Sequence, residues 1–427
     1  RGLYRHRDRA GDFIVTLRSP PKPSGRRAIV VGGSMSGLFT AAFLKKIGWR
    51  VDVYERSRTE LVGRGAGITG HPELFQVLVE CGAGLERLGV EVPKRIAIDR
   101  AGNVTDERPL RQILTSWDRL QRLLRTTIDE GHYHLGWNFE RVDQDERGVR
   151  VTFSGGRVEE ADILVGGDGI RSSVRGQVAP DVQPVYAGYY IWRGAPNEAD
   201  LAPKTLREIY PYFTFYLPPL QEVITYPIAG FNDDLTPGRR RFNFIWYRVA
   251  DAAQLRDMLV DDRGVQHEFS VPPPLVRKDL IAQMQDDARA IMPETLLDAV
   301  LKINQPFITP IYDFTAPSIV YGRVAMVGDA AANARPHMGF GMAKAGTDAQ
   351  ALARHLAENE DVERALAAYN AERQPIGNTI VTHGRRLGTH LGVNLQTEED
   401  HRMHALLQTD AAMLDWIAVP NFLDAYK

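Results

Sequence analysis

The stretch AIVVGGSMSGLFTAAFLKKIGWRVDVYER, which runs from Ala28 to Arg56, decides the fold of this chain. An apolar strand, Ala28 to Val31, leads into a glycine-rich turn, and apolar residues at helical spacing follow from near Ser36. Gly48 ends that helix, and a second strand, Val51 to Tyr54, comes next. A strand, a helix and a second strand in this order predict a parallel sheet with helices packed on it.

The glycine-rich turn fits the pattern G-x-G-x-x-G, except that Ser34 stands at the middle glycine. Gly32 permits the tight turn, Gly37 lets the helix pack on the strand, and the helix N-terminus attracts phosphate. Glu55, at the end of the second strand, is placed to accept hydrogen bonds from ribose hydroxyls. The turn therefore predicts a dinucleotide site, without deciding between NAD and FAD. The cofactor-binding residues predicted here are Gly32, Ser34, Ser36, Gly37, Glu55 and Arg56.

A second motif lies near the other end of the chain, in GRVAMVGDAAANARPHMGFGMAKAGTDA, Gly322 to Ala349. It predicts a strand that ends in Gly-Asp, then a loop rich in proline and glycine, then a helix over 341–357. Two remote stretches that both look like parts of a nucleotide site favour one long dinucleotide. We therefore expect flavin chemistry.

The composition excludes several classes of protein. The chain has 427 residues, 44% hydrophobic and 25% charged, with a formal net charge of −2, so we expect neither nucleic acid nor an anionic membrane as a partner. Its one cysteine, Cys81, forms no disulfide within the chain, which favours a reducing, cytoplasmic location. No apolar run is long enough to span a membrane. We expect residues 1–27, which are rich in arginine, to be a flexible arm outside the fold.

The middle of the chain differs from its two ends. Segments such as YAGYYIWRG and RRFNFIWYRV alternate aromatic and other residues, which predicts a mostly antiparallel sheet. The fold class is thus α/β, or α+β overall: a Rossmann-like FAD-binding domain (28–70, 105–180 and 318–375), interrupted by a substrate domain (71–104 and 181–317). A helical segment, 376–427, ends the chain. Helices are expected over 118–130, 251–260, 275–302 and 362–373, and a hairpin over 149–153 and 156–160.

Together with ILVGGDGIRSSVR, Ile163 to Arg175, these motifs resemble those of the single-component FAD-dependent aromatic hydroxylases of the p-hydroxybenzoate hydroxylase type. The resemblance implies that Asp168, Gly169, Ser172 and Arg175 approach FAD and the passing NAD(P)H. It also implies that Asp329 holds a ribityl hydroxyl of FAD. The loop after it would lie along the flavin ring, through Pro336, Gly339, Phe340, Gly341 and Met342.

The chain departs from the family pattern at three positions. Trp117 stands where an arginine often precedes the L-x-x-x-L helix, Ala332 stands where histidine is usual, and Ala343 replaces an asparagine. The sequence is most similar to the 2,6-dihydroxypyridine 3-hydroxylase branch of the family. That branch implies a hydroxypyridine or similar phenol as substrate, with O2 as co-substrate, and the family implies a homo-oligomer.

The resemblance implies hydroxylation through a flavin hydroperoxide, which an activated, phenolate-like ring carbon attacks. The pocket should then hold a base or donors that tolerate an oxyanion. The candidate catalytic residues are His337, Tyr216, Tyr226 and Arg193, with Trp192 and Trp246 as further aromatic candidates. Each single Tyr or Trp is more often core packing, Arg193 more often part of a salt bridge, and His337 equally often a loop residue bonded to backbone. No metal site is predicted, because His132 and His134 have no accompanying ligand cluster.

Three other functions remain open at the level of sequence. An NAD-dependent dehydrogenase would use the glycine-rich turn but leave the Asp329 motif unexplained. An FAD-dependent epoxidase or ring-opening oxygenase would use the same scaffold for another reaction. A flavin-binding carrier or regulator would bind the cofactor without turnover.

Overall fold

The strand that the opening motif predicts, β1 (Arg27–Val31), lies inside a six-stranded sheet of the computed structural model, which describes residues 24–61, 67–420 and 422–423. The strands, in spatial order, are β18 (Val320–Tyr321), β19 (Val324–Met326), β12 (Ile163–Gly166), β1, β2 (Arg50–Glu55) and β8 (Tyr133–Leu135). All neighbours pair in parallel except β18 and β19. Most of the expected arginine-rich arm, residues 1–23, lies outside the described residues.

The register of this sheet brings three loops together. Val31 pairs with Gly166, and Gly166 pairs with Met326, so the glycine-rich turn, the Asp-Gly motif and the Gly-Asp motif all leave the sheet at one edge. The packing there is close. A Cβ on Gly32, whose φ is +105°, would lie 2.5 Å from the carbonyl oxygen of Gly167, and a Cβ on Gly37 would lie 1.8 Å from that of Gly32. Glycine is therefore required at both positions.

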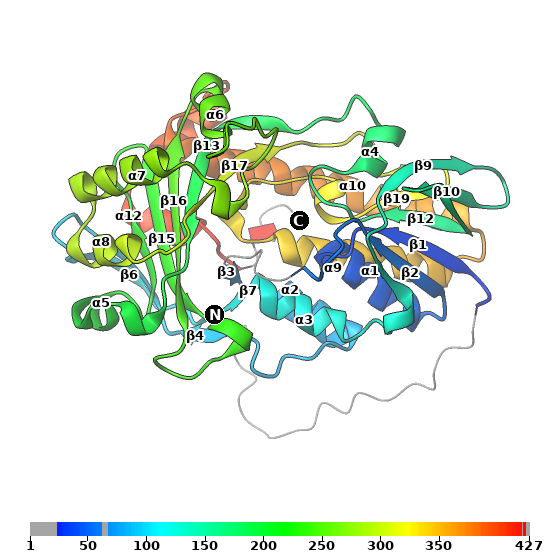
Figure 1. Cartoon of the computed structure of the whole chain (residues 1–427), viewed down its shortest axis with the longest axis horizontal. Helices are drawn as coiled ribbons and strands as arrows, with labels where there is room; N and C mark the ends of the chain where they lie inside the picture. The colour runs from blue at the N-terminus through cyan, green and yellow to red at the C-terminus, as the bar shows by residue number, and fades with distance from the viewer. Residues whose placement is uncertain (1–23, 62–66, 421, 424–427) are drawn as a thin grey trace.

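Three long helices cover this sheet and support its edge loops. α1 (Met35–Lys46) packs against α9 (Gly341–Glu358), and α9 also contacts α10 (Val362–Leu387) and α2 (Pro72–Cys81). Figure 1 shows this layer on one side of the molecule and a second, larger sheet on the other. None of the described helices is long and apolar enough to cross a membrane.

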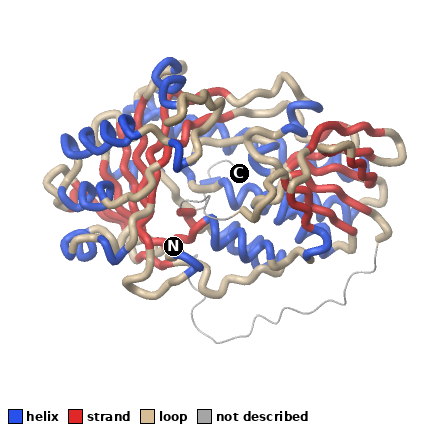
Figure 2. Tube along the Cα trace, viewed as in Figure 1, coloured by secondary structure: helices blue, strands red, loops and turns tan. Residues whose placement is uncertain are grey.

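The second sheet has seven strands, antiparallel except for one pair. In spatial order they are β17 (Phe307–Asp313), β13 (Val185–Gly194), β16 (Arg241–Val249), β15 (Gln221–Ile228), β14 (Phe213–Tyr216), β5 (Arg95–Ile98) and β6 (Val104–Arg108). The helices α5 (Pro203–Glu208), α7 (Lys278–Ile291) and α8 (Glu294–Leu301) lie on its far side, away from the parallel sheet (Figures 1 and 2). Its near side faces the parallel sheet.

Smaller elements complete the fold. Two three-stranded sheets are β3 (Gly67–Thr69), β7 (Gln112–Ser116) and β4 (Val90–Val92), and β11 (Arg157–Ala161), β10 (Val149–Phe153) and β9 (Phe139–Gln144). The remaining helices are α3 (Trp117–Arg125), α4 (Ser173–Val178), α6 (Ala252–Met258), α11 (Glu398–Leu406) and α12 (Asp410–Trp416). The predicted segment 71–104 is divided between the two layers, because α2 packs on α9 whereas β5 joins the seven-stranded sheet.

The hairpin predicted around residue 155 is confirmed, but several helix boundaries differ from those expected. The single helix expected over 275–302 is two helices, because Pro293 caps α8 and interrupts the ladder. The helix expected over 118–130 already ends at Arg125. The helix expected to end near residue 373 runs on to Leu387 with Pro375 inside it, where packing outweighs the local cost of a proline.

A buried charge network fixes the loop that carries the Gly-Asp motif. The Asp348 carboxylate accepts hydrogen bonds from Lys344 Nζ at 2.8 Å, from the Gly328 N–H at 3.0 Å and from Arg373 Nε at 2.9 Å. Lys344 also donates to the Gly328 carbonyl oxygen at 2.8 Å. Both cations hold the pKa of Asp348 below its usual value in spite of burial. The network ties α9 and α10 to the loop in front of Asp329.

We predict that Asp348→Asn lowers the free energy of unfolding by about 3–5 kcal/mol, because it leaves two buried cations without their counter-charge. The measurement is urea denaturation of the two proteins. As a control, Asp286→Asn removes an exposed partner of Arg289 and should change stability by less than about 0.5 kcal/mol. Equal effects of the two substitutions would contradict the assigned role.

Candidate active site

The edge where the three loops meet encloses a cavity of about 320 Å³. Its wall contains Gly32, Ser34, Ser36, Glu55, Arg56 and Asp168 from the predicted cofactor set, together with Tyr54 and Trp137. The cavity thus gathers residues from the glycine-rich turn, the second strand and the Asp-Gly motif. Gly37 is not on this wall, because it packs against the backbone of Gly32.

The first turn of α1 is open to an anion. Ser34, at the N-cap, makes no capping hydrogen bond with its side chain, and no acidic residue lies in the first turn. The N–H groups there and the helix dipole are therefore available to phosphate. Glu55 lies beside them, held by the N–H groups of Gly33 and Ser57, each 2.8 Å from a carboxylate oxygen. This places a fixed carboxylate within the same cavity, as a ribose requires.

Asp168 and Arg175 have different roles. Asp168 lies on the cavity wall, and it accepts hydrogen bonds from the Ser172 hydroxyl at 2.6 Å and from the Ser173 N–H at 2.7 Å. Arg175 is buried away from the wall, and donates to the carbonyl oxygens of Ala330 at 3.2 Å and Val182 at 3.1 Å. Arg175 therefore joins the Asp-Gly motif to the Gly-Asp loop, which positions both.

A second cavity, of about 440 Å³, continues from the first toward the seven-stranded sheet. Four residues line both cavities: Ile170, Arg171, Asp329 and Met342. The two spaces are therefore neighbours along one path, and Asp329 lies at their junction. A long ligand that extends from the glycine-rich turn into the second cavity would pass Asp329.

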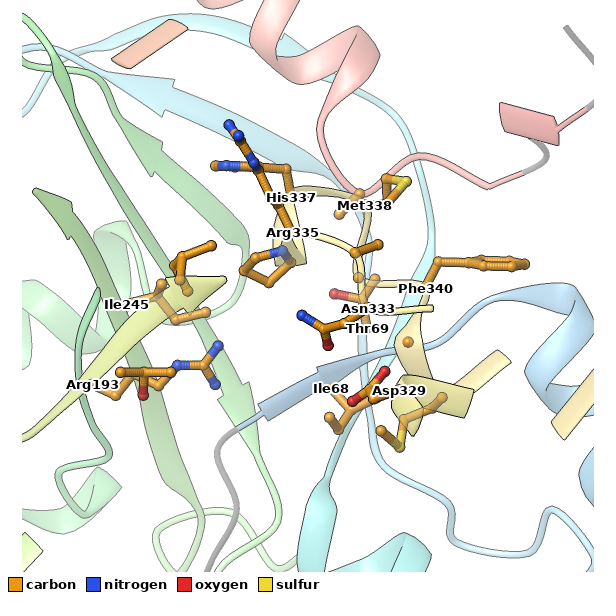
Figure 3. A pocket seen from close by; sticks show the side chains of 18 of the residues that line it. Ile68, Thr69, Arg193, Ile245, Asp329, Asn333, Arg335, His337, Met338 and Phe340 are labelled. Atoms are coloured by element: carbon orange, nitrogen blue, oxygen red, sulfur yellow. The ribbon is translucent and has the colours of Figure 1, made fainter. Parts of the chain in front are cut away.

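Asp329 is a carboxylate that the protein leaves free. It makes no side-chain hydrogen bond to the part of the chain that the structure describes, although it lies at the base of the second cavity (Figure 3). Burial raises its pKa, and the nearby Lys344 and Arg175 oppose that rise. A free acceptor in a sheltered position fits a ligand that brings hydroxyl groups to it.

The loop after Asp329 forms one wall of the second cavity through the residues expected to lie along the flavin ring: Pro336, Gly339, Phe340, Gly341 and Met342. Gly339 has a φ of +62°, and a Cβ there would lie 2.9 Å from Cβ of Thr69. The backbone is thus pressed against β3 and presents a surface with few side chains. α9 begins at Gly341 on the cavity wall, and no acidic residue in its first turn offsets the positive end of the helix there. A flat ring whose edge becomes negative on reduction fits this wall.

The seven-stranded sheet forms the opposite wall, and alternation along its strands decides which residues reach the cavity. Of the candidate catalytic residues on this sheet, Arg193 and Tyr226 line the cavity. Tyr216 does not: its side chain belongs to the core on the far side of the sheet, and its hydroxyl donates to the Ile291 carbonyl oxygen at 2.6 Å. Trp192 and Trp246 pack in that same far core.

Arg193 reaches from the sheet into the cavity, opposite Asn333 and Asp329 (Figure 3). Its guanidinium has no ion pair or hydrogen bond among the residues that the structure describes, and its Nε is fully buried. The expectation that a salt bridge would occupy this arginine is therefore not met. An unpaired cation in a sheltered cavity is a receptor for an anion.

His337 also lines the cavity, but its nitrogens face the protein. Nε2 lies 2.8 Å from the Tyr189 hydroxyl, and Nδ1 lies 3.4 Å from Glu222 Oε2. Burial lowers the pKa of His337 to about 4, so the ring is neutral at neutral pH. This geometry offers no ring nitrogen to a substrate in the cavity.

Sequence reasoning missed four further cavity residues: Thr69, Tyr247, Asn333 and Arg335. For one of them the sequence did contain a signal, in the aromatic strand RRFNFIWYRV. Successive side chains of a strand point to opposite faces of the sheet, so Tyr247 must face away from Trp246. The other three lie in short loops or at a strand end, where no periodicity operates.

Two family profiles match the chain: an "FAD binding domain-like" profile over 186–313 and an "FAD binding domain" profile over 275–383. The chain is 32% identical over 375 residues to 2,6-dihydroxypyridine 3-monooxygenase of Paenarthrobacter nicotinovorans, a match that covers 86% of this chain and 92% of that protein. This chain belongs to the family of FAD-dependent aromatic hydroxylases. It is an FAD-dependent monooxygenase, and the alternative of an NAD-dependent dehydrogenase is thereby set aside.

Other relatives agree with this assignment. The chain is 28% identical to an FAD-dependent urate hydroxylase of Klebsiella pneumoniae, over 84% of this chain and 89% of that protein. Among solved structures, 2,6-dihydroxypyridine-3-hydroxylase from Arthrobacter nicotinovorans superposes with a TM-score of 0.82 at 32% identity, over 87% of this chain and 93% of that one. HpxO of Klebsiella pneumoniae, complexed with FAD and uric acid, shares the fold with a TM-score of 0.73 at 21% identity, over 93% of this chain and 97% of that one.

The residues present fit FAD. The open turn of α1 and Glu55 suit the adenosine diphosphate part, the free carboxylate of Asp329 suits the ribityl chain, and the loop at Gly339 suits the ring. We predict that Asp329→Ala weakens FAD binding about 10- to 100-fold, the range expected for losing a hydrogen bond to a charged group. Titration of the apoprotein with FAD, followed by flavin fluorescence, measures this.

Asp286→Ala, at an exposed position far from both cavities, is the matched control and should retain the unaltered affinity. If Asp329→Ala bound FAD as tightly as this control, the assignment of Asp329 to the cofactor would fail.

Proposed function

We propose that the protein hydroxylates a small, electron-rich aromatic ring that binds as an anion, a hydroxypyridine or similar phenol, with NAD(P)H as reductant and O2 as co-substrate. The observation that carries the proposal is the unpaired guanidinium of Arg193 in the second cavity, opposite the loop that fits the flavin ring. The similarity to 2,6-dihydroxypyridine 3-monooxygenase supports the hydroxypyridine class.

Arg193 would bind and orient the ionised hydroxyl of such a ring. A phenolate-like oxygen donates electron density to the ring carbon beside it, and a cation fixed nearby stabilises that ionised form before reaction. FAD, when bound, supplies the activated oxygen for transfer to the ring. Arg193 and Asp329 lie on opposite walls of the cavity, so a ring held at Arg193 lies between the sheet and the flavin loop (Figure 3).

Two tyrosines complete the polar lining on the sheet side. Tyr226 and Tyr247 are almost fully buried on the cavity wall. Burial raises the pKa of Tyr226 to about 12, and also raises that of Tyr247, so both remain protonated at neutral pH. Each hydroxyl can therefore donate a hydrogen bond to an oxyanion. In this proposal Tyr226 touches substrate, whereas Tyr216 supports the far core and His337 acts as a positioning residue.

Apolar side chains form much of the remaining cavity wall. Phe213, Ile224, Ile245, Ile311 and Met338 line it, and all five are buried. An apolar wall around a few polar groups is typical of a site for a flat organic ligand. It also strengthens the interaction of Arg193 with an anion, because the local dielectric constant is low.

The reaction is tested by following oxygen into the product. Each of a panel of hydroxypyridines and phenols is incubated with the FAD-loaded enzyme, NADH or NADPH, and 18O2, and the products are analysed by mass spectrometry. The proposal expects one labelled oxygen atom per product with the ring intact. Two labelled atoms or an opened ring would favour the alternative ring-opening oxygenase, and flavin that NAD(P)H never reduces would favour a carrier.

We predict that Arg193→Met lowers kcat/KM for an anionic substrate on the order of 100-fold or more, because a buried charge pair is lost. The same substitution should weaken binding of the anionic substrate strongly, but weaken binding of an analogue with a methoxy group in place of the ionised hydroxyl much less. Steady-state kinetics with the substrate and equilibrium binding of both ligands to the FAD-loaded enzyme measure the difference.

Arg248→Met is the matched control, since Arg248 lies on the adjacent strand β16 and pairs with Asp287 on the far side of the sheet. Arg248→Met should leave kcat/KM within a few-fold of the wild-type value. An equal effect of Arg193→Met on anionic and methoxy ligands would contradict the proposed contact.

We also propose a cytoplasmic location and a homo-oligomer. The buried, unpaired thiol of Cys81 supports a reducing compartment, and the family resemblance supports oligomerisation. Light scattering of the purified protein tests the second point.

A further inference from the structure

Behind the substrate cavity lies a cluster of three buried side chains whose facing polar atoms do not touch the substrate in the proposed hydroxylation. Glu222 comes from β15, His337 from the turn η6 (Pro336–Met338) and His390 from the turn η7 (Gly388–Leu391). Their exposed fractions are 0%, 1% and 5%. Of the three, His337 alone belongs to the lining of the cavity, whereas Glu222 and His390 lie behind it.

The polar atoms of this cluster face one another without hydrogen bonds. Glu222 Oε2 lies 3.4 Å from His337 Nδ1 and 3.3 Å from His390 Nε2. These three atoms and Glu222 Oε1 are buried and have no hydrogen-bond partner in the part of the chain that the structure describes. Four buried polar atoms without hydrogen bonds at one place destabilise the folded protein, because each has lost its hydrogen bonds to water.

Other histidine–carboxylate pairs in the same protein are ordinary hydrogen bonds. His132 with Asp52, His267 with Asp261 and His355 with Glu372 all lie at 2.8 Å. A proton shared between charged partners gives this short separation. The separations around Glu222 are about half an ångström longer and make no hydrogen bond, a spacing that leaves room for a cation larger than a proton between the atoms.

The far sides of the two imidazoles fix their orientation. His390 Nδ1 donates to the Leu387 carbonyl oxygen at 2.8 Å, because a carbonyl oxygen can only accept, and His390 Nε2 faces Glu222. His337 Nε2 is held by the Tyr189 hydroxyl at 2.8 Å. Metal-binding histidines show this arrangement, in which an outer partner holds the second nitrogen. A cation between the two facing ring nitrogens and the carboxylate would satisfy all of these atoms.

The separations match those of two ligands on one metal ion. Nitrogen and oxygen ligands lie about 2.0–2.1 Å from zinc, so neighbouring ligands of a tetrahedral site lie about 3.3–3.4 Å apart. The three ligand atoms here all lie within 4.8 Å of one another. Glu222 Oε1 is available as a fourth ligand, and two imidazoles with a carboxylate suit a divalent first-row transition metal.

We propose that Glu222, His337 and His390 bind one divalent transition-metal ion, with zinc as the best fit, in a closed structural site behind the substrate cavity. The ion links β15 of the seven-stranded sheet to η6 of the flavin loop and to η7 at the end of α10. It fixes the distance between the two walls of the cavity. This proposal does not depend on the identity of the substrate.

The test is the metal content of the purified FAD-loaded enzyme, measured by plasma mass spectrometry after dialysis against metal-free buffer and again after addition of Zn²⁺. The expected result is about one zinc per chain, which resists dialysis and raises the melting temperature. Substitution of Co²⁺ should give the visible absorption of a tetrahedral site. Glu222→Gln and His390→Gln should each lower the stoichiometry at least tenfold.

The matched control is His355→Gln, which removes a histidine that pairs with a glutamate in an ordinary hydrogen bond. It should keep the full metal content. Less than 0.1 equivalent of bound metal in the wild-type enzyme after Zn²⁺ addition would overturn the proposal, and this measurement needs no variant to fold. Equal Zn²⁺ binding by wild type, Glu222→Gln and His355→Gln would overturn it as well.

Discussion

The parallel pairing of β1 with β12 and of β12 with β19 is the constraint on which the rest of the structure depends. It sets Val31, Gly166 and Met326 side by side, so the three motifs that follow them are neighbours although they are remote in sequence. Gly32 and Gly37 allow the three loops to approach this closely, because a Cβ at either position would overlap the neighbouring backbone. The Asp348 network then holds the Gly-Asp loop in place from behind, so that Asp329 can stay free for the cofactor.

The opposite wall follows from the alternation of the antiparallel sheet. Its far face is buried beneath helices and is therefore apolar and aromatic, whereas its near face carries Arg193, Tyr226 and Tyr247. A guanidinium without a partner in such a cavity lowers the stability of the folded protein. Among the described residues, no hydrogen bond or ion pair to Arg193 compensates for this loss. Local cost of this kind is typical of a functional site, where the ligand supplies the missing partner. The same reasoning applies to the convergent atoms of Glu222, His337 and His390.

Much of the fold could be predicted from the sequence. The opening motif combines apolar residues at helical spacing, a glycine-rich turn, and segments of the right length for a strand, a helix and a second strand. The sequence also predicted which residues meet at the first cavity, since glycines and an acid at this spacing are typical of a dinucleotide site. The substrate side could not be predicted fully. Tyr216 and Tyr226 look alike as residues of aromatic strands, and only the register of β14 and β15 shows that one faces α7 and the other the cavity. The Glu222 cluster joins three segments with no common pattern, so no local signal could reveal it.

The account is tested most directly by the flavin of the purified enzyme and by its anaerobic reduction. The visible spectrum should show bound FAD, and NADH or NADPH should bleach it much faster when a hydroxypyridine or phenol that fits the Arg193 cavity is present. The ligand that accelerates bleaching most would then identify the substrate class. A protein that takes up no FAD, even after reconstitution of the apoprotein, would contradict the central claim that the three converging motifs hold one flavin beside a substrate cavity.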